Sequence, residues 1–187
     1  MSIHLRPPAR PPRGTTVIEL AVVVAVAAVL VGLAAPDLRR VVAGRAVATQ
    51  AAGLMADLRY ARSEAEKFGE PVTVCAIADP AVEPPHCIGG IGRADWRAGW
   101  LVFVDRNRPG EFDGNDRLLT RRQPLAASGG VEGTLRSVTY TAAGFSIDAA
   151  SHYLFRPVSA GDGGPAPALV CVSKQGRARL APGAACK

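Results

Sequence analysis

The amino-acid sequence predicts an α+β fold in which one long N-terminal helix packs on an antiparallel β-sheet head. An apolar run from Val17 to Ala35 continues into a helical pattern that ends near Phe68. From Pro71 onward, short β-branched and aromatic runs alternate with Gly, Pro, Asp and Asn, as is typical of strands joined by turns. We therefore expect four segments: residues 1–14, 15–36, 37–69 and 70–187.

The predicted helix of residues 15–36 is suited to a bilayer. About 19 apolar residues at roughly 1.5 Å per residue span roughly 28 Å, close to the thickness of the hydrocarbon core. Arginines flank the run on both sides and therefore do not fix its orientation. They are Arg6, Arg10 and Arg13 before it and Arg39, Arg40 and Arg45 after it.

One carboxylate, Glu19, interrupts the apolar run, which contains no Lys or Arg. An ionised acid at the centre of a membrane helix costs about 3 kcal/mol, so Glu19 calls for a nearby cation. Three interpretations remain open: a secretory signal removed near Ala34, a simple anchor, or a leader cut between Gly14 and Thr15. The third supplies the cation, because the cut creates an α-ammonium group on Thr15, four residues before Glu19.

The second predicted helical segment, residues 37–69, is amphipathic. Its apolar positions recur at alternating steps of four and three, which indicates a packing face. They are Val47, Ala51, Leu54, Leu58, Ala61, Ala65 and Phe68. Lys67 in the last turn, Gly69 as a left-handed cap and Pro71 beyond it predict an end near Phe68.

The head, residues 70–187, is predicted to be a sheet with short connections that favour antiparallel pairing. The candidate strands are residues 71–78, 99–105, 116–122, 137–142, 152–157 and 168–173. Residues 79–99 and 157–168 are rich in Pro and Gly and are predicted to be loops.

The four cysteines, Cys75, Cys87, Cys171 and Cys186, form no CxxC motif. An even number beyond an export-like N-terminus predicts two disulfides and a head outside the cytoplasm. Four cysteines allow three connectivities, which the count leaves open. We expect Cys75 to pair with Cys87 and Cys171 with Cys186, because each pair is close in sequence and encloses a loop containing Gly or Pro.

The sequence offers little support for catalysis, a metal or a cofactor. His4, His86 and His152 lack ligand spacing, and no phosphate-binding or nucleophile motif is present. Residues 105–116 approach a calcium loop, but Pro109 offers no side-chain oxygen at the fifth position and Asp116 replaces the terminal glutamate. We interpret this segment as a polar turn, and we expect a protein that is not an enzyme.

The N-terminal pattern resembles that of type IV pilins and pseudopilins. The leader ends at Gly14, Glu19 is fifth when Thr15 is counted as first, and Pro36 is twenty-second. The resemblance implies leader cleavage by a prepilin peptidase, N-methylation at Thr15, and roles for Glu19 and Pro36 in filament assembly. Thr15 departs from the family, in which the first mature residue is usually Phe or Met.

The head is similar to the GspH/FimT group of minor pilins. The matching pieces are "LRYARSEAEKFGEPVTVC", "DWRAGWLVFVD", "YTAAGFS" and "LVCVSKQGRARL". The resemblance implies a structural subunit of a type IV pilus or a type II secretion pseudopilus, with other pilins or pseudopilins as partners. It also implies a single-pass protein of the inner membrane with its head in the periplasm, and in a filament or at the pilus tip after assembly.

The stretch "KQGRARL" is the candidate recognition element. On a strand after Gly176, Arg177 and Arg179 would point to one face about 6 to 7 Å apart, with Lys174 nearby. In FimT-like proteins a Gly-Arg-x-Arg element is associated with DNA binding, and Gly176, Arg177 and Arg179 match it. Net charge is weaker support, since it falls from +6 to +3 when the three leader arginines are subtracted. A structural subunit without DNA binding is the alternative.

Overall fold

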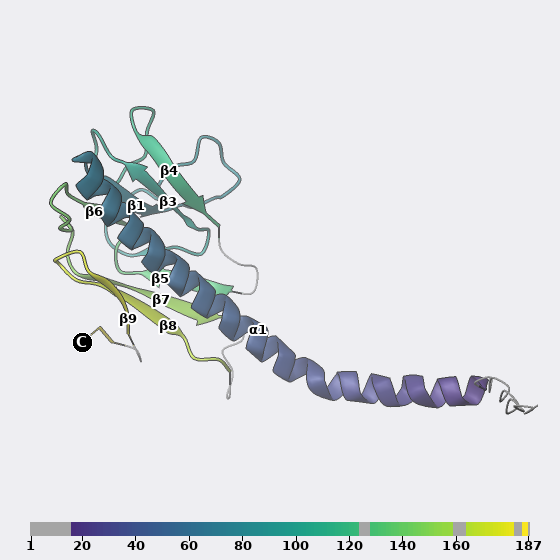
Figure 1. Ribbon diagram of the computed structural model, residues 1–187. Helices are drawn as coiled ribbons and strands as arrows, with labels where there is room; N and C mark the ends of the chain where they lie inside the picture. Colours follow the sequence, from purple (N-terminus) through teal and green to yellow (C-terminus); the bar gives the residue numbers. More distant parts are fainter. Residues whose placement is uncertain (1–15, 124–127, 159–163, 182–184, 187) are drawn as a thin grey trace, which may run out of the picture. The chain divides into compact units, whose positions relative to one another are not determined.

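The structure is a computed structural model that describes residues 16–123, 128–158, 164–181, 185 and 186 (Figure 1). It divides into two compact units, one ending at Leu38 and one beginning at Arg39. The predicted leader, with Gly14 and Thr15, lies outside the described residues.

Helix α1 (Val17–Phe68) is a single helix that runs through both units. Thr16 caps its start, since the Thr16 Oγ1 accepts a hydrogen bond from the Glu19 N–H at 3.3 Å. It ends where the sequence predicts: the Gly69 N–H donates to the Ala65 carbonyl, and Gly69 has a φ of 68°.

The second half of α1 supplies one wall of the core. Six residues of the predicted apolar stripe are buried, with Ala51, Leu54, Leu58, Ala61 and Ala65 each 0% exposed, while Phe68 is partly buried. These positions share one side of the helix because residues three and four apart lie one above the other. The amphipathic pattern is thereby explained as a packing face.

Two antiparallel sheets form the head (Figure 1). The four-stranded sheet has the order β4-β3-β1-β6, and its strands are β1 (Val72–Ala76), β3 (Trp100–Val104), β4 (Arg117–Arg122) and β6 (Ser137–Tyr140). The five-stranded sheet has the order β2-β5-β7-β8-β9, and its strands are β2 (Ala94–Asp95), β5 (Ser128–Gly133), β7 (Ser151–Pro157), β8 (Ala168–Val172) and β9 (Ala178–Ala181). The predicted α+β class and antiparallel pairing are confirmed.

A single main core joins α1 to the inner faces of both sheets. Trp96 lies at its centre, 4.8 Å from Tyr153 of β7 and 6.4 Å from Trp100 of β3 between ring centroids. Its indole N–H donates to the Leu135 carbonyl at 2.9 Å, so the buried ring leaves no unpaired donor. This residue therefore connects the two sheets.

A second, smaller core lies on the other side of the four-stranded sheet. It consists of Cys75, Ile77, Leu101 and Phe103, with Phe112 packed edge-on against Phe103 at 5.1 Å. Both faces of this sheet are therefore covered, which explains why every residue of β1 and β3 is buried. In contrast, β7 alternates buried and exposed residues, because the five-stranded sheet has one solvent-facing side.

Candidate functional site

The predicted recognition element is the hairpin formed by β8 and β9. The Gly176 N–H donates to the Ser173 carbonyl at 2.8 Å, and the Ser173 N–H donates to the Arg177 carbonyl at 3.0 Å. Gly176 has a φ of 78°, and a Cβ there would lie 2.9 Å from the Gly144 carbonyl oxygen and from the Tyr140 ring. Glycine is therefore required by both the turn and its packing.

The tip of this hairpin is fixed against α1. The Arg62 Nη1 donates to the Gln175 carbonyl at 3.4 Å, while the Arg62 Nε contacts the Glu66 carboxylate at 3.2 Å. The turn also packs on Tyr140, whose ring is fully buried and whose pKa is raised by desolvation. The candidate element is thus a docked hairpin, which pre-positions the side chains it carries.

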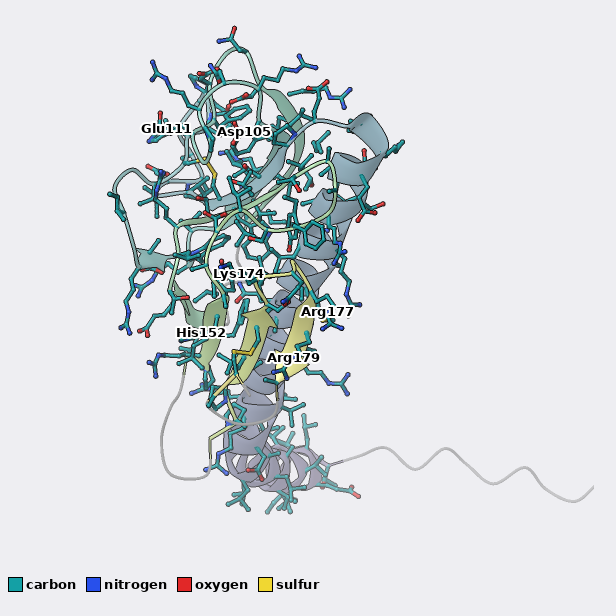
Figure 2. All side chains as sticks on the ribbon, turned by 90° about the vertical axis from the view of Figure 1, so that its left-hand side faces the viewer. Asp105, Glu111, His152, Lys174, Arg177 and Arg179 are labelled. Carbon is teal, nitrogen blue, oxygen red and sulfur yellow. A yellow bond between two sulfur atoms is a disulfide. The ribbon has the colours of Figure 1, made fainter. Side chains whose placement is uncertain are left out.

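Lys174, Arg177 and Arg179 are exposed on this hairpin (Figure 2). Of the ion pairs among the residues that the structure describes, none involves these three cations. Arg179 stands opposite Cys171 in the register, and Ala178 packs against the main core. Since side chains alternate along a strand, Arg177 and Arg179 share the face that points away from α1, about 6 to 7 Å apart.

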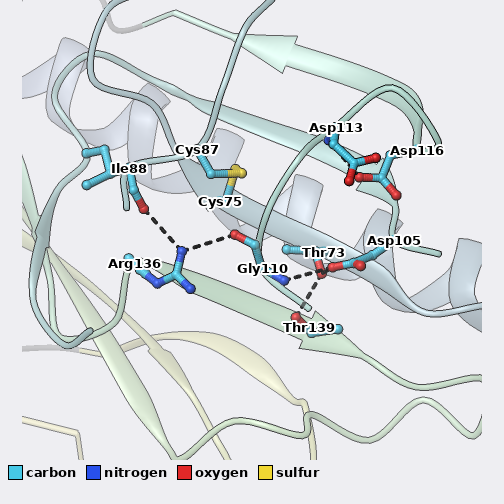
Figure 3. Close-up of a disulfide and its surroundings, with 10 residues drawn as sticks. All are labelled: Thr73, Cys75, Cys87, Ile88, Asp105, Gly110, Asp113, Asp116, Arg136 and Thr139. Atoms are coloured by element: carbon cyan, nitrogen blue, oxygen red, sulfur yellow. Dashed lines mark hydrogen bonds between the residues drawn. A yellow bond between two sulfur atoms is a disulfide. The ribbon is translucent and has the colours of Figure 1, made fainter. Parts of the chain in front are cut away.

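One disulfide lies beside this arginine pair. Cys171 is bonded to Cys186, with a Cα–Cα distance of 5.8 Å, so a residue near the chain end is attached to the outer face of β8. The other disulfide joins Cys75 to Cys87 with a Cα–Cα distance of 5.6 Å, next to the smaller core (Figure 3). No cysteine in the described part of the chain is free.

The segment from Asp105 to Asp116 is a turn whose carboxylates are already engaged (Figure 3). The Asp105 Oδ2 accepts from the Thr73 hydroxyl at 2.7 Å and from the Gly110 N–H at 2.8 Å. Burial raises the pKa of the Asp105 carboxyl, and these two bonds oppose the shift. Among the described residues, no group of three acidic, His or Cys side chains is arranged to hold a metal ion.

The first unit contains the only described helix long and apolar enough to cross a membrane, by length and composition. Val17, Ile18, Leu20 and the other large apolar side chains up to Leu38 are exposed. Glu19 is exposed in the first turn, and Pro36 lies within α1. The first unit therefore presents an exposed apolar surface.

Sequence reasoning missed a buried polar junction between α1 and the four-stranded sheet. The Asp57 carboxylate is 5% exposed and accepts from the Trp100 indole N–H at 2.8 Å and from the Arg122 Nε at 2.9 Å. The hydrogen bond to Asp57 raises the pKa of the Arg122 guanidinium. Gln50, Asp57 and Glu64 recur every seven residues beside the apolar stripe, and all three are buried. This spacing is the sequence pattern that could have indicated a buried polar contact on α1.

Comparison with protein families gives a match over the second unit. Residues 50–176 match the family model described as "Type II transport protein GspH". The chain belongs to the GspH family. The match takes in the end of α1 and β1 to β8 of this GspH-family chain, and it stops at Gly176, so Arg177 and Arg179 lie outside it.

Solved structures give the fold of this GspH-family protein independently. A crystal structure of the type IV minor pilin FimU from Pseudomonas aeruginosa is 20% identical, with a TM-score of 0.52, and covers 73% of this chain and 88% of that one. A second crystal form of FimU is 20% identical with a TM-score of 0.49, covering 72% and 91%. No curated protein matches the chain. The protein has the type IV minor pilin fold and is a GspH/FimT-like member of the pilin family.

Proposed function

We propose that this minor-pilin-like structural subunit holds DNA by its phosphate backbone through the β8–β9 hairpin. The observation that supports the proposal most directly is the group of three exposed cations, Lys174, Arg177 and Arg179, with no carboxylate partner. Unpaired arginines on a docked hairpin bind phosphate without losing an existing ion pair. Binding would be indifferent to base sequence, because contacts to the backbone read charge.

The test is the salt dependence of DNA binding by the full chain in an uncharged detergent. Each phosphate contact contributes about −0.9 to the slope of log affinity against log salt, so three contribute about −2.7. Replacing Arg177 and Arg179 together by Ala should flatten the slope by about 1.8, with an unchanged circular dichroism spectrum.

A matched control removes two exposed arginines of α1 that have no ion pair among the described residues, Arg45 and Arg59. Arg121 and Arg122 are unsuitable for this purpose, because Arg121 bonds to Glu83 and the Pro80 carbonyl and Arg122 bonds to buried Asp57. Equal losses of DNA affinity in the two double variants would show that binding depends on general positive charge and not on the hairpin. Absence of salt-dependent binding in the wild-type chain would favour the purely structural subunit.

The same proposal includes processing and membrane anchoring. A prepilin peptidase would cut between Gly14 and Thr15, and the new α-ammonium group would face the Glu19 carboxylate of a neighbouring subunit. The apolar exposed surface of the first unit and the family membership support a membrane-anchored pilus or pseudopilus subunit. Co-expression with the peptidase should give a mature chain that starts at Thr15 by mass spectrometry; a start near Ala35 would contradict cleavage of this kind.

We assign the subunit no catalytic role. His86 and His152 are exposed, and no triad or ligand group involves either. Before assembly the head would lie in the periplasm, with other pilins or pseudopilins as partners. The fold is shared by pilus and secretion subunits, so the machine is assigned by the DNA test: binding favours a pilus, and its absence favours secretion.

A further inference from the structure

The outer face of the five-stranded sheet carries a row of side chains that crosses β7, β8 and β9 and continues through Thr134, just after β5, to Arg93, just before β2. In the register, His152 of β7 stands opposite Cys171 of β8, which stands opposite Arg179 of β9. On the other side, the Thr134 N–H donates to the His152 carbonyl at 3.0 Å, and the His152 N–H donates to the Thr134 Oγ1 at 3.0 Å. Arg93, just before β2, lines the same groove as Thr134 and His152.

This row faces solvent because of the alternation along β7. Tyr153 and Phe155 are fully buried and point into the main core, so His152, Leu154 and Arg156 point the other way. Figure 2 shows His152 and Arg179 on this side, with a disulfide between them. The disulfide is that of Cys171 and Cys186, which makes the middle of the row apolar.

The neighbouring carboxylates on this face are held by other arginines. The Glu132 carboxylate accepts from the Arg156 Nη2 at 3.0 Å, and the Asp95 carboxylate contacts the Arg97 Nε at 2.8 Å. The Arg156 bond lowers the pKa of Glu132, and the charges of Arg93 and Arg97 lower it further. Arg93 and Arg179 at the two ends of the row have no ion pair among the described residues, so the row keeps its positive charge.

The Arg93 end of the row is a groove of about 580 Å³. Arg93, Thr134 and His152 line it together with Glu132 and Leu154. It is large enough for a nucleotide-sized group, since ligand sites are usually about 300 to 1,000 Å³. The row offers cations and hydrogen-bond donors but no phenyl or indole ring for base stacking, which favours contact with a backbone over contact with unstacked bases.

From this placement we infer that a duplex DNA backbone crosses the strands of this sheet, from the β8–β9 hairpin to the groove at β2, with Arg93 and His152 as further phosphate contacts. The inference rests on the proposed function and extends its site from one hairpin to a face. Four strand spacings of about 4.8 Å give a path of about 19 Å. That length corresponds to five or six base pairs at the rise of about 3.4 Å.

The decisive variants lie at the far end of the row from the hairpin. With Arg93 as a fourth ionic contact, the wild-type salt slope on a duplex should be about −3.6, and Arg93→Ala should flatten it by about 0.9. Arg45→Ala is the matched control, since Arg45 is an exposed arginine of α1 with no ion pair among the described residues. His152→Leu should weaken binding at fixed salt, because leucine has no hydrogen-bond donor to offer a phosphate.

A substitution that should raise DNA affinity provides a second test of the same path. Glu132→Gln removes a negative charge beside the row and releases Arg156, so affinity should rise several-fold at low salt. Glu111→Gln is its control, because Glu111 is also exposed and paired with an arginine, Arg108 at 3.7 Å. Its affinity should match the wild type.

The outcomes separate this inference from the proposed function. If the Arg177 and Arg179 double variant loses affinity while Arg93→Ala matches Arg45→Ala and Glu132→Gln matches Glu111→Gln, the site is confined to the hairpin and the inference is wrong. If no variant changes binding and the wild type shows no salt slope, the proposed function fails with it. The crossing path is supported if Arg93→Ala loses DNA affinity and Glu132→Gln gains it while the controls stay unchanged.

Discussion

Asp57 shows how one side chain can connect the helix to the sheet. Its carboxylate is buried on α1, yet it has a charged partner from β4 and a neutral donor from β3. The arginine partner keeps half of its surface in water, at 52% side-chain exposure, so it loses little hydration in forming the pair. Such a pair avoids much of the cost of burying two charges.

We predict that Asp57→Ala lowers the free energy of unfolding by about 1 to 3 kcal/mol. The main cause is the buried Trp100 N–H, which loses its acceptor, while Arg122 can turn to solvent. Asp95→Ala is the control, because Asp95 and Arg97 form an exposed pair worth less than about 1 kcal/mol. Urea unfolding followed by the fluorescence of the two core tryptophans measures both, and equal effects would show that the junction adds no stability.

The pKa values of two further carboxyl groups, those of Asp105 and Asp148, predict how the free energy of unfolding depends on pH. Burial raises the pKa of Asp105 and of Asp148 above the ordinary value of 3.8. A carboxyl with a higher pKa in the folded state binds its proton more tightly there than in the unfolded state. Its contribution to the free energy of unfolding is therefore fully present below about pH 3.8. It is lost as the pH rises through the folded-state pKa.

Relative to Asp105→Asn, the wild-type protein should therefore lose stability as the pH rises from about 4 to 7. The urea midpoints of the two proteins across this range provide the measurement. Relative to Asp113→Asn, the wild-type protein should instead gain stability as the pH rises. The reason is that hydrogen bonds from the Asn115 N–H and the Asn107 amide lower the pKa of Asp113. A constant difference between wild type and Asp105→Asn would contradict the raised pKa.

At the scale of elements, the β8–β9 hairpin depends on a single glycine. We predict that Gly176→Ala costs about 1 to 3 kcal/mol of unfolding free energy, because its φ is positive and a Cβ would contact backbone and a buried ring. It should also weaken the proposed DNA binding, since Arg177 follows directly. Gly89→Ala is the control: a Cβ there meets nothing within 4 Å. Equal midpoints for the two variants in urea unfolding would contradict the packing role of Gly176.

The sequence predicted those elements whose own residues determine them. Six strands carry β-branched or aromatic residues and were predicted within a few positions, and so was the end of α1. In contrast, β5 reads Ser-Gly-Gly-Val-Glu-Gly, which has low strand propensity. Its glycines are needed because a Cβ at Gly129 would lie 2.2 Å from the Pro157 carbonyl oxygen and one at Gly133 would lie 2.4 Å from the Trp96 indole nitrogen. Tertiary packing therefore decided this strand.

The same distinction applies to the candidate site, whose residues could be predicted only where they are adjacent in sequence. Gly176, Arg177 and Arg179 are adjacent in sequence and could be recognised as one element. Arg93 and His152 could not be joined to them, because their common row exists only through the pairing of β2, β5, β7, β8 and β9. Beside the apolar stripe, Asp57 remained hidden because its partners lie 43 and 65 residues away.

At the scale of the whole molecule, Glu19 should matter for assembly and not for insertion. We predict that Glu19→Ala and Glu19→Gln reach the membrane in normal amounts but are incorporated poorly into filaments, because the α-ammonium group that the proposed cleavage creates on a neighbouring subunit loses its partner. Leu20→Ala, which keeps the carboxylate, is the control. Fractionation into membrane and sheared filament pools provides the measurement, and normal incorporation of both Glu19 variants would contradict this role.

The continuity of α1 also has a mechanical consequence. The helix that carries the exposed apolar surface also supplies one wall of the main core, because α1 runs without a break from Val17 to Phe68. Each disulfide joins a strand of one sheet to a segment outside both sheets, and neither links sheet to sheet. A pulling force on the N-terminal half would therefore be transmitted by covalent bonds directly into the main core. It would be resisted there by the packing of the apolar stripe and by the hydrogen bonds that join Asp57 to β3 and β4.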